Sequence, residues 1–230
     1  MPIALITGAS RGLGRAAARA LAQRGWSLIV DARRADDLAD AMRGLTDVAA
    51  VPGDVTDPGH RAGLAAAVGR AGGLDVLVNN ASRLGPSPQP LLRDYPLDEF
   101  ARVYDTNVLA PLALIQLLAA PLVAAAGTVV NVSSDAAVEA YPGWGGYGSA
   151  KAALDQLTAV LAAEEPSLRC YALDPGDMRT DLHQQAFPGE DISDRPEPET
   201  VVPALLRLIG ERPPSGRYRA SDLAVPAVAP

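Results

Sequence analysis

Short apolar runs alternate with longer helical patterns along almost the whole chain. The runs are continuously apolar and rich in Val, Ile and Leu, which is typical of strands buried on both faces of a parallel sheet. The patterns between the runs predict helices. The expected strands are residues 3–7, 27–32, 48–51, 74–79, 127–132 and 168–173, and the expected helices are residues 12–24, 36–43, 58–70, 97–118 (in one or two pieces) and 147–163.

This alternation predicts an α/β fold of the Rossmann type, a doubly wound parallel sheet with helices on both faces. The sequence has no internal repeat and no linker, so residues 1–230 are expected to form a single domain. Two polar, proline-containing stretches interrupt the rhythm, at residues 82–96 and 180–200. Such sheets bind ligands at the carboxyl ends of their strands, so we expect 180–200 to be a mobile loop that orders over the ligand. Residues 224–230 are expected to be an untethered tail.

Composition narrows the class of function. The net charge of −7 and the pI of about 4.8 exclude a basic surface for nucleic acid or for an acidic membrane. There is no basic leader and no apolar stretch of about 18 residues, so neither secretion nor a membrane span is expected. The lone Cys170, expected in a buried strand, fits the reducing cytoplasm, which is the expected location. Lys151 is the only lysine among the 20 basic residues, which suggests a position where Arg cannot replace it.

The first chemical motif, TGASRGLG from Thr7 to Gly14, lies between the first expected strand and the first expected helix. Glycine permits a tight turn there and lets the backbone approach a phosphate, which the free N–H groups of the helix attract. An ordinary glycine-rich turn is the alternative, but the strand–turn–helix context favours a dinucleotide site. The expected cofactor-binding residues are Thr7, Gly8, Ser10, Arg11, Gly12, Leu13 and Gly14.

The end of the second expected strand predicts which cofactor binds. An acidic residue there holds the ribose hydroxyls of NAD, whereas Arg accommodates the 2′-phosphate of NADP. We place Ala32 rather than Asp31 at the discriminating position, so that Arg33 and the upstream Arg11 form a cation pair for the phosphate. NADP(H) is therefore expected to be preferred over NAD(H). Solvated surface arginines are the alternative.

The third motif is YGSAK, from Tyr147 to Lys151. Residues four apart lie on one face of a helix, so the phenol and the ammonium group point to the same place. A nearby ammonium stabilises the phenolate and is expected to lower the pKa of Tyr147, which makes that residue a workable general acid and base. Ser134, thirteen residues upstream of Tyr147, makes a chance match a poor explanation.

Together these motifs resemble the short-chain dehydrogenase/reductase family, in its main single-domain, NADP(H)-preferring branch, over residues 3–223. The resemblance implies that Asn107, Ser134, Tyr147 and Lys151 are catalytic and that Tyr147 and Lys151 also contact the cofactor. It further implies cofactor contacts from Asp54 and Val55 after the third strand, from Asn80 and Ala81 in an NNA motif, and from Pro175, Gly176, Met178 and Thr180. Ser82 stands where that motif usually has Gly, a departure that puts the local backbone in question but none of the chemical roles.

The expected activity is NADP(H)-dependent interconversion of a carbonyl and an alcohol by hydride transfer, with a small molecule as substrate. Ser134 would polarise the carbonyl, Tyr147 would donate the proton, and Asn107 would hold a water. An epimerase or dehydratase of the same fold, and a catalytically silent NADP(H)-binding redox sensor, are the alternatives. The resemblance also implies a homodimer or homotetramer formed through residues 107–118 and 147–163.

Other residues receive weaker assignments. Leu84, Leu91 and Trp144 indicate a partly hydrophobic substrate pocket. For Trp144 and its neighbour Tyr141, aromatic packing is an equal alternative to lining the pocket. His60 and His183 lack the spacing of metal ligands and are expected on the surface, so no metal site is expected.

Overall fold

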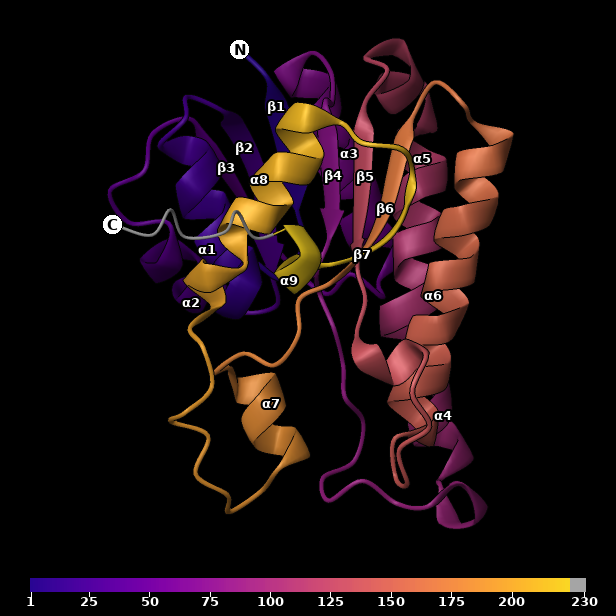
Figure 1. The fold of residues 1–230 in the computed structure, drawn as a ribbon. Coiled ribbons are helices and arrows are strands. Elements are labelled where there is room, and N and C mark those ends of the chain that lie inside the picture. Colours follow the sequence, from indigo (N-terminus) through magenta and orange to yellow (C-terminus); the bar gives the residue numbers. More distant parts are fainter. Residues whose placement is uncertain (224–230) are drawn as a thin grey trace, which may run out of the picture.

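The computed structural model describes residues 1–223, and the expected tail at 224–230 lies outside the described residues. Seven strands form one sheet in the order β3-β2-β1-β4-β5-β6-β7, and each neighbouring pair is parallel (Figure 1). In β1 and β2 the pairing runs from Ile3 opposite Ser27 to Ile6 opposite Val30. The strands are β1 (Ile3–Ile6), β2 (Ser27–Ala32), β3 (Val48–Pro52), β4 (Val76–Asn79), β5 (Thr128–Val132), β6 (Arg169–Asp174) and β7 (Gly216–Arg219).

Helices cover both faces of this sheet because side chains alternate between the two faces along each strand. Ala4 and Ile6 of β1 pack in one core with α1, α2 and α8, whereas Ile3 and Leu5 pack in a second core with α3 and α5. Figure 1 shows α1, α2, α8 and α9 in front of the sheet. The helices are α1 (Gly12–Ala22), α2 (Ala35–Ala41), α3 (Pro58–Ala71), α4 (Leu97–Tyr104), α5 (Ala110–Ala124), α6 (Gly145–Glu164), α7 (Asp181–Ala186), α8 (Val202–Glu211) and α9 (Ala220–Leu223).

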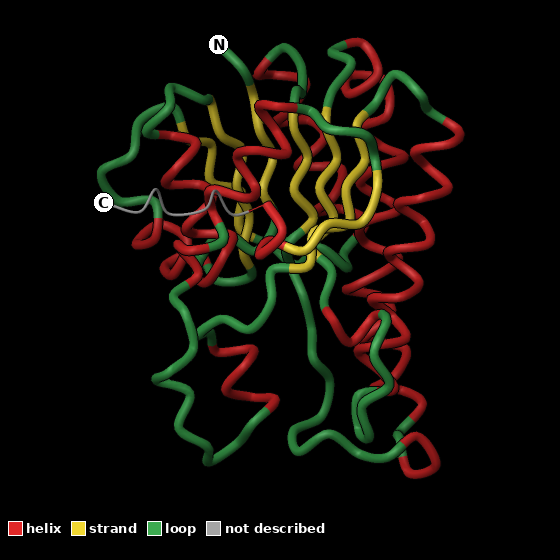
Figure 2. The backbone as a smooth tube through the Cα atoms, in the orientation of Figure 1, coloured by secondary structure: helices red, strands yellow, loops and turns green. Residues whose placement is uncertain are grey.

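The strand order places a crevice beside β1. From β1 the chain proceeds to β2 and β3 on one side, and β4 to β7 follow on the other. Loops leaving β1 and β4 therefore diverge at their carboxyl ends, which is where doubly wound sheets bind their ligands. Figure 2 shows long loops extending from this edge of the sheet.

The predicted Rossmann-type fold is confirmed, and each of the six predicted strands is present within two residues of its expected bounds. Helix α8 and the edge strand β7, Gly216–Arg219, are present but were not predicted from the sequence. The sequence of β7, GRYR, is polar because this strand pairs with β6 on one side only and its residues are not deeply buried. It therefore lacks the continuous apolar pattern on which the other strands were recognised.

Residues Leu97–Ala124 form one helical run in which a π-helical turn, Asp105–Leu109, joins α4 to α5. The expectation that the chain has no apolar stretch long enough to cross a membrane is wrong, since this run has a mean hydropathy of 1.9 over its most apolar window. Leu114, Leu118 and Leu122 are buried in the core that α3 and α5 form with one face of the sheet. The run therefore occupies the place of a core helix.

The 180–200 segment follows β6 and is not a plain loop. It contains α7 and a short 3-10 turn at Pro198–Thr200, and Figure 1 shows α7 lying beyond the carboxyl ends of the strands. Thr180 caps α7 by accepting a hydrogen bond from the main-chain N–H of His183 at 3.2 Å. That this segment moves and orders over a ligand stays a prediction.

Candidate active site

The turn after β1 is shaped by its glycines. Gly8 and Gly12 have φ angles of +68° and +54°, which only glycine adopts readily. A Cβ atom on Gly8 would lie 2.9 Å from Ala81 Cα, and one on Gly14 would lie 2.5 Å from the Gly8 carbonyl oxygen. The helix that follows has no side-chain cap and no acidic residue in its first turn. Its free N–H groups are therefore available to a phosphate, and the turn fits the pyrophosphate of a dinucleotide.

The carboxylate of Asp31 holds the Gly8–Gly14 turn through a hydrogen bond to its backbone. Its Oδ1 accepts a hydrogen bond from Gly8 N at 2.7 Å, and its Oδ2 lies 3.0 Å from His60 Nε2. Burial raises the pKa of Asp31, although its bonds to His60 and Gly8 oppose that effect. His60, expected on the surface, is buried, since its side chain is only 6% exposed. A pairing partner 29 residues away in sequence left no local pattern by which to predict this.

The two predicted phosphate-binding arginines lie at the same end of one cavity. Arg11 pairs with Asp181 of α7 at 2.6 Å, with both side chains largely exposed. Arg33 is exposed and has no ion-pair or hydrogen-bond partner within residues 1–223. Its neighbour Arg34 pairs instead with Asp37, at 3.1 Å. Of the two predicted arginines, Arg33 is therefore the one that makes no ion pair in the described part of the chain.

The cavity has a volume of about 890 Å³ and follows the carboxyl edge of the sheet from Arg33 to Tyr147. It brings most of the predicted site residues together. Those that line it are Gly8, Ser10, Arg11, Gly12, Leu13, Arg33, Asp54, Val55, Asn80, Ala81, Ser134, Tyr147, Lys151, Pro175, Gly176, Met178 and Thr180.

Three predicted site residues, Thr7, Gly14 and Asn107, do not line this cavity. Thr7 Oγ1 accepts hydrogen bonds from the main-chain N–H groups of Asn80 and Ala81, both at 3.0 Å. The Asn80 side chain in turn donates to the Thr7 carbonyl at 2.9 Å. Thr7 therefore joins β1 to β4 at the crevice, and Gly14 makes room for the turn, so both support the site from behind its wall.

Tyr147 and Lys151 lie on the first turns of α6, and both are buried. The Lys151 ammonium donates to the Val132 carbonyl at 2.7 Å and lies 5.5 Å from the centre of the Tyr147 ring. Burial lowers the pKa of Lys151 to about 8, an effect that the nearby Asp155 opposes. The two side chains face the cavity beside Ser134, whose hydroxyl donates to Asp135 Oδ1 at 2.9 Å.

The predicted lowering of the Tyr147 pKa is wrong for this arrangement. Burial raises the pKa of Tyr147 to about 12, and a hydrogen bond with Ser82 only partly offsets this, while Asp135 and Asp174 add to it. The largest contribution is the free-energy cost of removing the phenolate from water. Tyr147 therefore holds its proton throughout the neutral range, which suits a proton donor.

Asn107 is fully buried in the π-helical turn and is engaged by the loop after β4. Its Oδ1 accepts from Ser82 Oγ at 2.8 Å and from Arg83 N at 3.1 Å, and its Nδ2 donates to the Arg83 carbonyl at 2.7 Å. The Ser82 hydroxyl lies between Asn107 and Tyr147 and hydrogen-bonds to both, a pair of contacts that was not predicted from the sequence. The unusual residue after the NNA motif was the available signal.

The outer end of the cavity is aromatic and apolar. Trp144 packs edge-on to Tyr147, with ring centres 5.9 Å apart, and also contacts Phe187 beyond α7. Leu84 is buried against Tyr147, whereas Leu91 is 45% exposed and does not line the cavity, contrary to its expected place. His183, also expected on the surface, is buried in α7, and its Nε2 has no hydrogen-bond partner in the described part of the chain.

A phosphate-accepting turn, a cavity along the carboxyl edge and a buried tyrosine–lysine pair together define a nicotinamide-dependent oxidoreductase. The sequence profile of the short chain dehydrogenase family matches residues 2–191. 2-(R)-hydroxypropyl-CoM dehydrogenase of Xanthobacter autotrophicus is 32% identical over 228 residues, which cover 91% of each chain. L-xylulose reductase of Homo sapiens is 31% identical over 235 residues, covering 96% of this chain and 93% of the reductase.

The fold is shared with solved enzymes of this kind. The alcohol dehydrogenase from the archaeon Thermococcus sibiricus, complexed with 5-hydroxy-NADP, superposes with a TM-score of 0.84 at 28% identity, covering 95% of each chain. This chain belongs to the short-chain dehydrogenase/reductase family. It is an oxidoreductase that acts on CH–OH groups and their carbonyl counterparts, with a nicotinamide dinucleotide as the cofactor typical of the family.

Proposed function

We propose that this enzyme reduces a ketone or aldehyde with NADPH, and oxidises the corresponding alcohol, using Tyr147 as general acid and base. The observation that carries the proposal is the buried Tyr147, which faces the cavity with the chain's single lysine four residues further along α6. Bound NADPH would supply the hydride. The residues from Gly8 to Gly14 would hold its pyrophosphate, and Pro175 to Thr180 its nicotinamide end.

The side chains then divide the remaining work. Ser134 and Tyr147 would donate hydrogen bonds to the substrate oxygen and orient the carbonyl. Tyr147 would transfer its proton to that oxygen as negative charge develops there, and Lys151 would stabilise the resulting phenolate. Ser82, which hydrogen-bonds to Tyr147 and donates its hydroxyl proton to Asn107 Oδ1, would help to hold the phenol in place, a role that was not predicted from the sequence. Trp144, Leu84 and Phe187 would exclude water from this end of the cavity.

The direct test is a screen of ketones, aldehydes and alcohols with NADPH and NADP⁺, followed at the absorbance of the reduced nicotinamide. We expect turnover with substrates that have an apolar group next to the carbonyl, because the outer cavity is lined by aromatic and aliphatic side chains. Quenching of NADPH fluorescence without oxidation across the whole panel would favour the silent binding module instead.

We further propose that NADP(H) is preferred over NAD(H). Both carboxylate oxygens of Asp31 are already hydrogen-bonded inside the protein, so Asp31 is a poor partner for ribose hydroxyls. Arg33 is exposed at the cavity end. Arg11 pairs only with Asp181 at the surface, where ion pairs contribute little, so a 2′-phosphate can replace that partner.

Replacing Arg33 by Ala tests this preference. Charge-assisted hydrogen bonds are worth roughly 1.5–3 kcal/mol, so the wild-type kcat/KM is expected to be at least about tenfold higher with NADPH than with NADH. Arg33→Ala should remove most of that difference and leave turnover with NADH nearly unchanged. Arg43→Ala is the matched control, because Arg43 is also an exposed arginine but does not line the cavity, so its loss should leave the ratio unaltered. A wild type that favours NADH would show that Asp31 accepts the ribose hydroxyls.

We also infer that the enzyme is a homodimer or homotetramer. Apolar side chains are exposed on the predicted helices, with Leu109, Leu117 and Val123 on the α5 side and Val160 on α6 between 39% and 53% exposed. Burying them against a second copy would remove apolar surface from water. Light scattering coupled to size exclusion should report a dimer or tetramer, and Leu117→Asp should shift it toward smaller species. A monomeric wild type would contradict the inference.

A further inference from the structure

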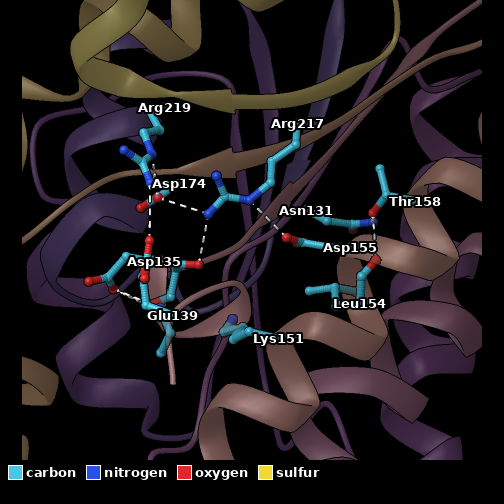
Figure 3. Close-up of polar contacts among 12 residues, drawn as sticks. Asn131, Asp135, Glu139, Lys151, Leu154, Asp155, Thr158, Asp174, Arg217 and Arg219 are labelled. Atoms are coloured by element: carbon cyan, nitrogen blue, oxygen red, sulfur yellow. Dashed lines mark hydrogen bonds and ion pairs between the residues drawn. The ribbon is translucent and has the colours of Figure 1, made fainter. Parts of the chain in front are cut away.

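Arg217 of β7 joins three other elements at the carboxyl edge of the sheet. Figure 3 shows its guanidinium group between Asp174 and Asp155. Arg217 Nε donates to Asp155 Oδ2 on α6 at 3.0 Å, and Nη2 donates to Asp174 Oδ2 at the end of β6 at 2.9 Å. The same Nη2 donates to the main-chain carbonyl of Ser134, after β5, at 3.0 Å. The side chains of Asp155 and Asp174 are 15% and 4% exposed, so these charge-assisted bonds are shielded from water.

Asp174 connects Arg217 to the Pro175–Gly176 turn, which is predicted to hold the nicotinamide. Asp174 Oδ1 accepts a hydrogen bond from Gly176 N at 3.0 Å. One carboxylate therefore receives Arg217 on one oxygen and the Pro175–Gly176 turn on the other. Arg219, two residues beyond Arg217, comes no closer to Asp174 than 3.9 Å, and its side chain is half exposed. It therefore adds little to the link between Asp174 and β7.

The segment that delivers Ser134 is held from both sides. Lys151 donates to the carbonyl of Val132, Arg217 donates to the carbonyl of Ser134, and the N–H of Ser133 between them donates to the Leu173 carbonyl at 2.7 Å. Because the backbone is held at three successive residues, Ser134 cannot shift relative to the cavity without breaking these bonds. The position of Ser134 relative to Lys151 therefore depends on Arg217.

Arg217 also balances the charges around the tyrosine–lysine pair. Asp155 follows Lys151 by one helical turn and raises its pKa, against the larger lowering by burial. Asp135 after β5 and Asp174 on β6 raise the pKa of Tyr147. Arg217 contacts two of these three carboxylates directly, so its positive charge limits their effect on both groups.

We propose that Arg217 is a positioning residue for catalysis, whose single guanidinium group sets both the relative placement of Ser134, the Pro175–Gly176 turn and α6, and the charge balance at Lys151. The inference rests on the proposed roles of Tyr147 and Lys151. Arg217 itself does not line the cavity. Its effect is exerted through Asp155, Asp174 and the Ser134 backbone.

The single lysine of this chain makes the charge balance directly measurable. Protein labelled with ¹³C- and ¹⁵N-lysine gives one side-chain signal, whose chemical shift reports the ionisation of Lys151 as the pH is raised. Arg217→Met removes a positive charge and should raise the Lys151 pKa above its value of about 8, by at least about half a unit. Asp155→Asn removes a negative charge and should lower it. A purely structural pair would not shift this pKa in opposite directions.

Arg212 provides the matched control. It donates to Thr128 Oγ1, at the opposite end of β5, at 3.1 Å, and to the carbonyl of Ala126 in the turn before that strand at 2.5 Å. Arg212→Met should lower the melting temperature without moving the Lys151 titration or kcat. Arg217→Met should lower kcat by about 10- to 100-fold with a smaller change in KM, the loss expected when catalytic groups are misplaced. Arg217→Lys keeps the positive charge but not the shape of the guanidinium group. The pH at which kcat falls should therefore return to its wild-type value, whereas kcat itself should recover less.

Unchanged Lys151 titration in both Arg217→Met and Asp155→Asn overturns the inference. If Arg217→Met does not fold, Arg217→Gln, which also removes the positive charge, takes its place in the titration. The titration needs no turnover, so a wild type that reduces no carbonyl counts against the proposed function alone. Equal behaviour of Arg217→Met and Arg212→Met, with losses in melting temperature only, would leave Arg217 an ordinary structural residue.

Discussion

Replacing Tyr147 by Phe is expected to lower kcat for carbonyl reduction by about 10²- to 10⁴-fold, the contribution of a well-placed general acid. The phenol is buried beside Lys151, and its raised pKa of about 12 keeps the proton on the oxygen at every pH where the enzyme would be assayed. Phe keeps the ring and its packing on Trp144 but removes that proton. NADPH affinity, measured by fluorescence quenching, should change little, because the turn that holds the pyrophosphate is untouched.

Tyr171→Phe is the matched control for this substitution. Tyr171 is a fully buried tyrosine of β6 whose hydroxyl donates to the Pro213 carbonyl at 2.7 Å, away from the cavity. Its loss should cost some stability, about 1 kcal/mol for one hydrogen bond, and leave kcat unchanged. If Tyr147→Phe retained activity within a few-fold of wild type, the proton would have to come from another group, and Ser82 would be the first to test.

The parts of the fold that were predictable are those with a local pattern. Each buried parallel strand is a continuous apolar run, and for that reason residues 3–7 or 127–132 could be recognised without any partner. The edge strand β7 offers no such run, because Arg217 and Arg219 point into a polar network at the carboxyl edge. Residues Gly216–Arg219 form a strand because they pair with β6, and this pairing also places Arg217. Neither could be predicted from local sequence.

The candidate site was predictable where spacing alone carries the chemistry. Tyr147 and Lys151 are four residues apart on one helix, so their meeting needs no tertiary information. The partners of Asn107 and His60 are distant in sequence, at Ser82 and at Asp31, so spacing along the chain could not predict them. His60, expected in solvent, has a buried side chain against a carboxylate, whereas the expected water at Asn107 stays a prediction.

The predicted direction of the Tyr147 pKa shift was wrong for a related reason. The sign of the shift depends on how far burial outweighs a neighbouring ammonium, and burial cannot be judged from spacing along a helix. Lys151 shows the same effect from the other side, since burial lowers its pKa. The helix face brought the two groups together, whereas the surrounding loops from β4 and β5 determined their protonation.

Lys151 is expected to govern the pH dependence of carbonyl reduction. Its pKa of about 8 means that it carries its charge below that pH and loses it as the pH rises further. The developing Tyr147 phenolate needs that charge, so kcat should fall as the pH rises through about 8. Tyr147 itself cannot cause this fall, because its pKa is about 12. The measurement is kcat at saturating NADPH between pH 6 and pH 10, roughly the span over which a group of this pKa titrates.

Lys151→Met and Lys151→Arg separate the charge from its geometry. Met removes the ammonium and should lower kcat by about 10²- to 10³-fold, within the range for a group that assists proton transfer. Arg stays charged across this pH range, so any residual activity of Lys151→Arg should no longer fall near pH 8. It should still be low, because Lys151 is almost fully buried and donates to Val132 from a space fitted to a single compact ammonium group. An alkaline limb near pH 8 that persists in Lys151→Arg would assign that ionisation to another group and remove Lys151 from proton transfer.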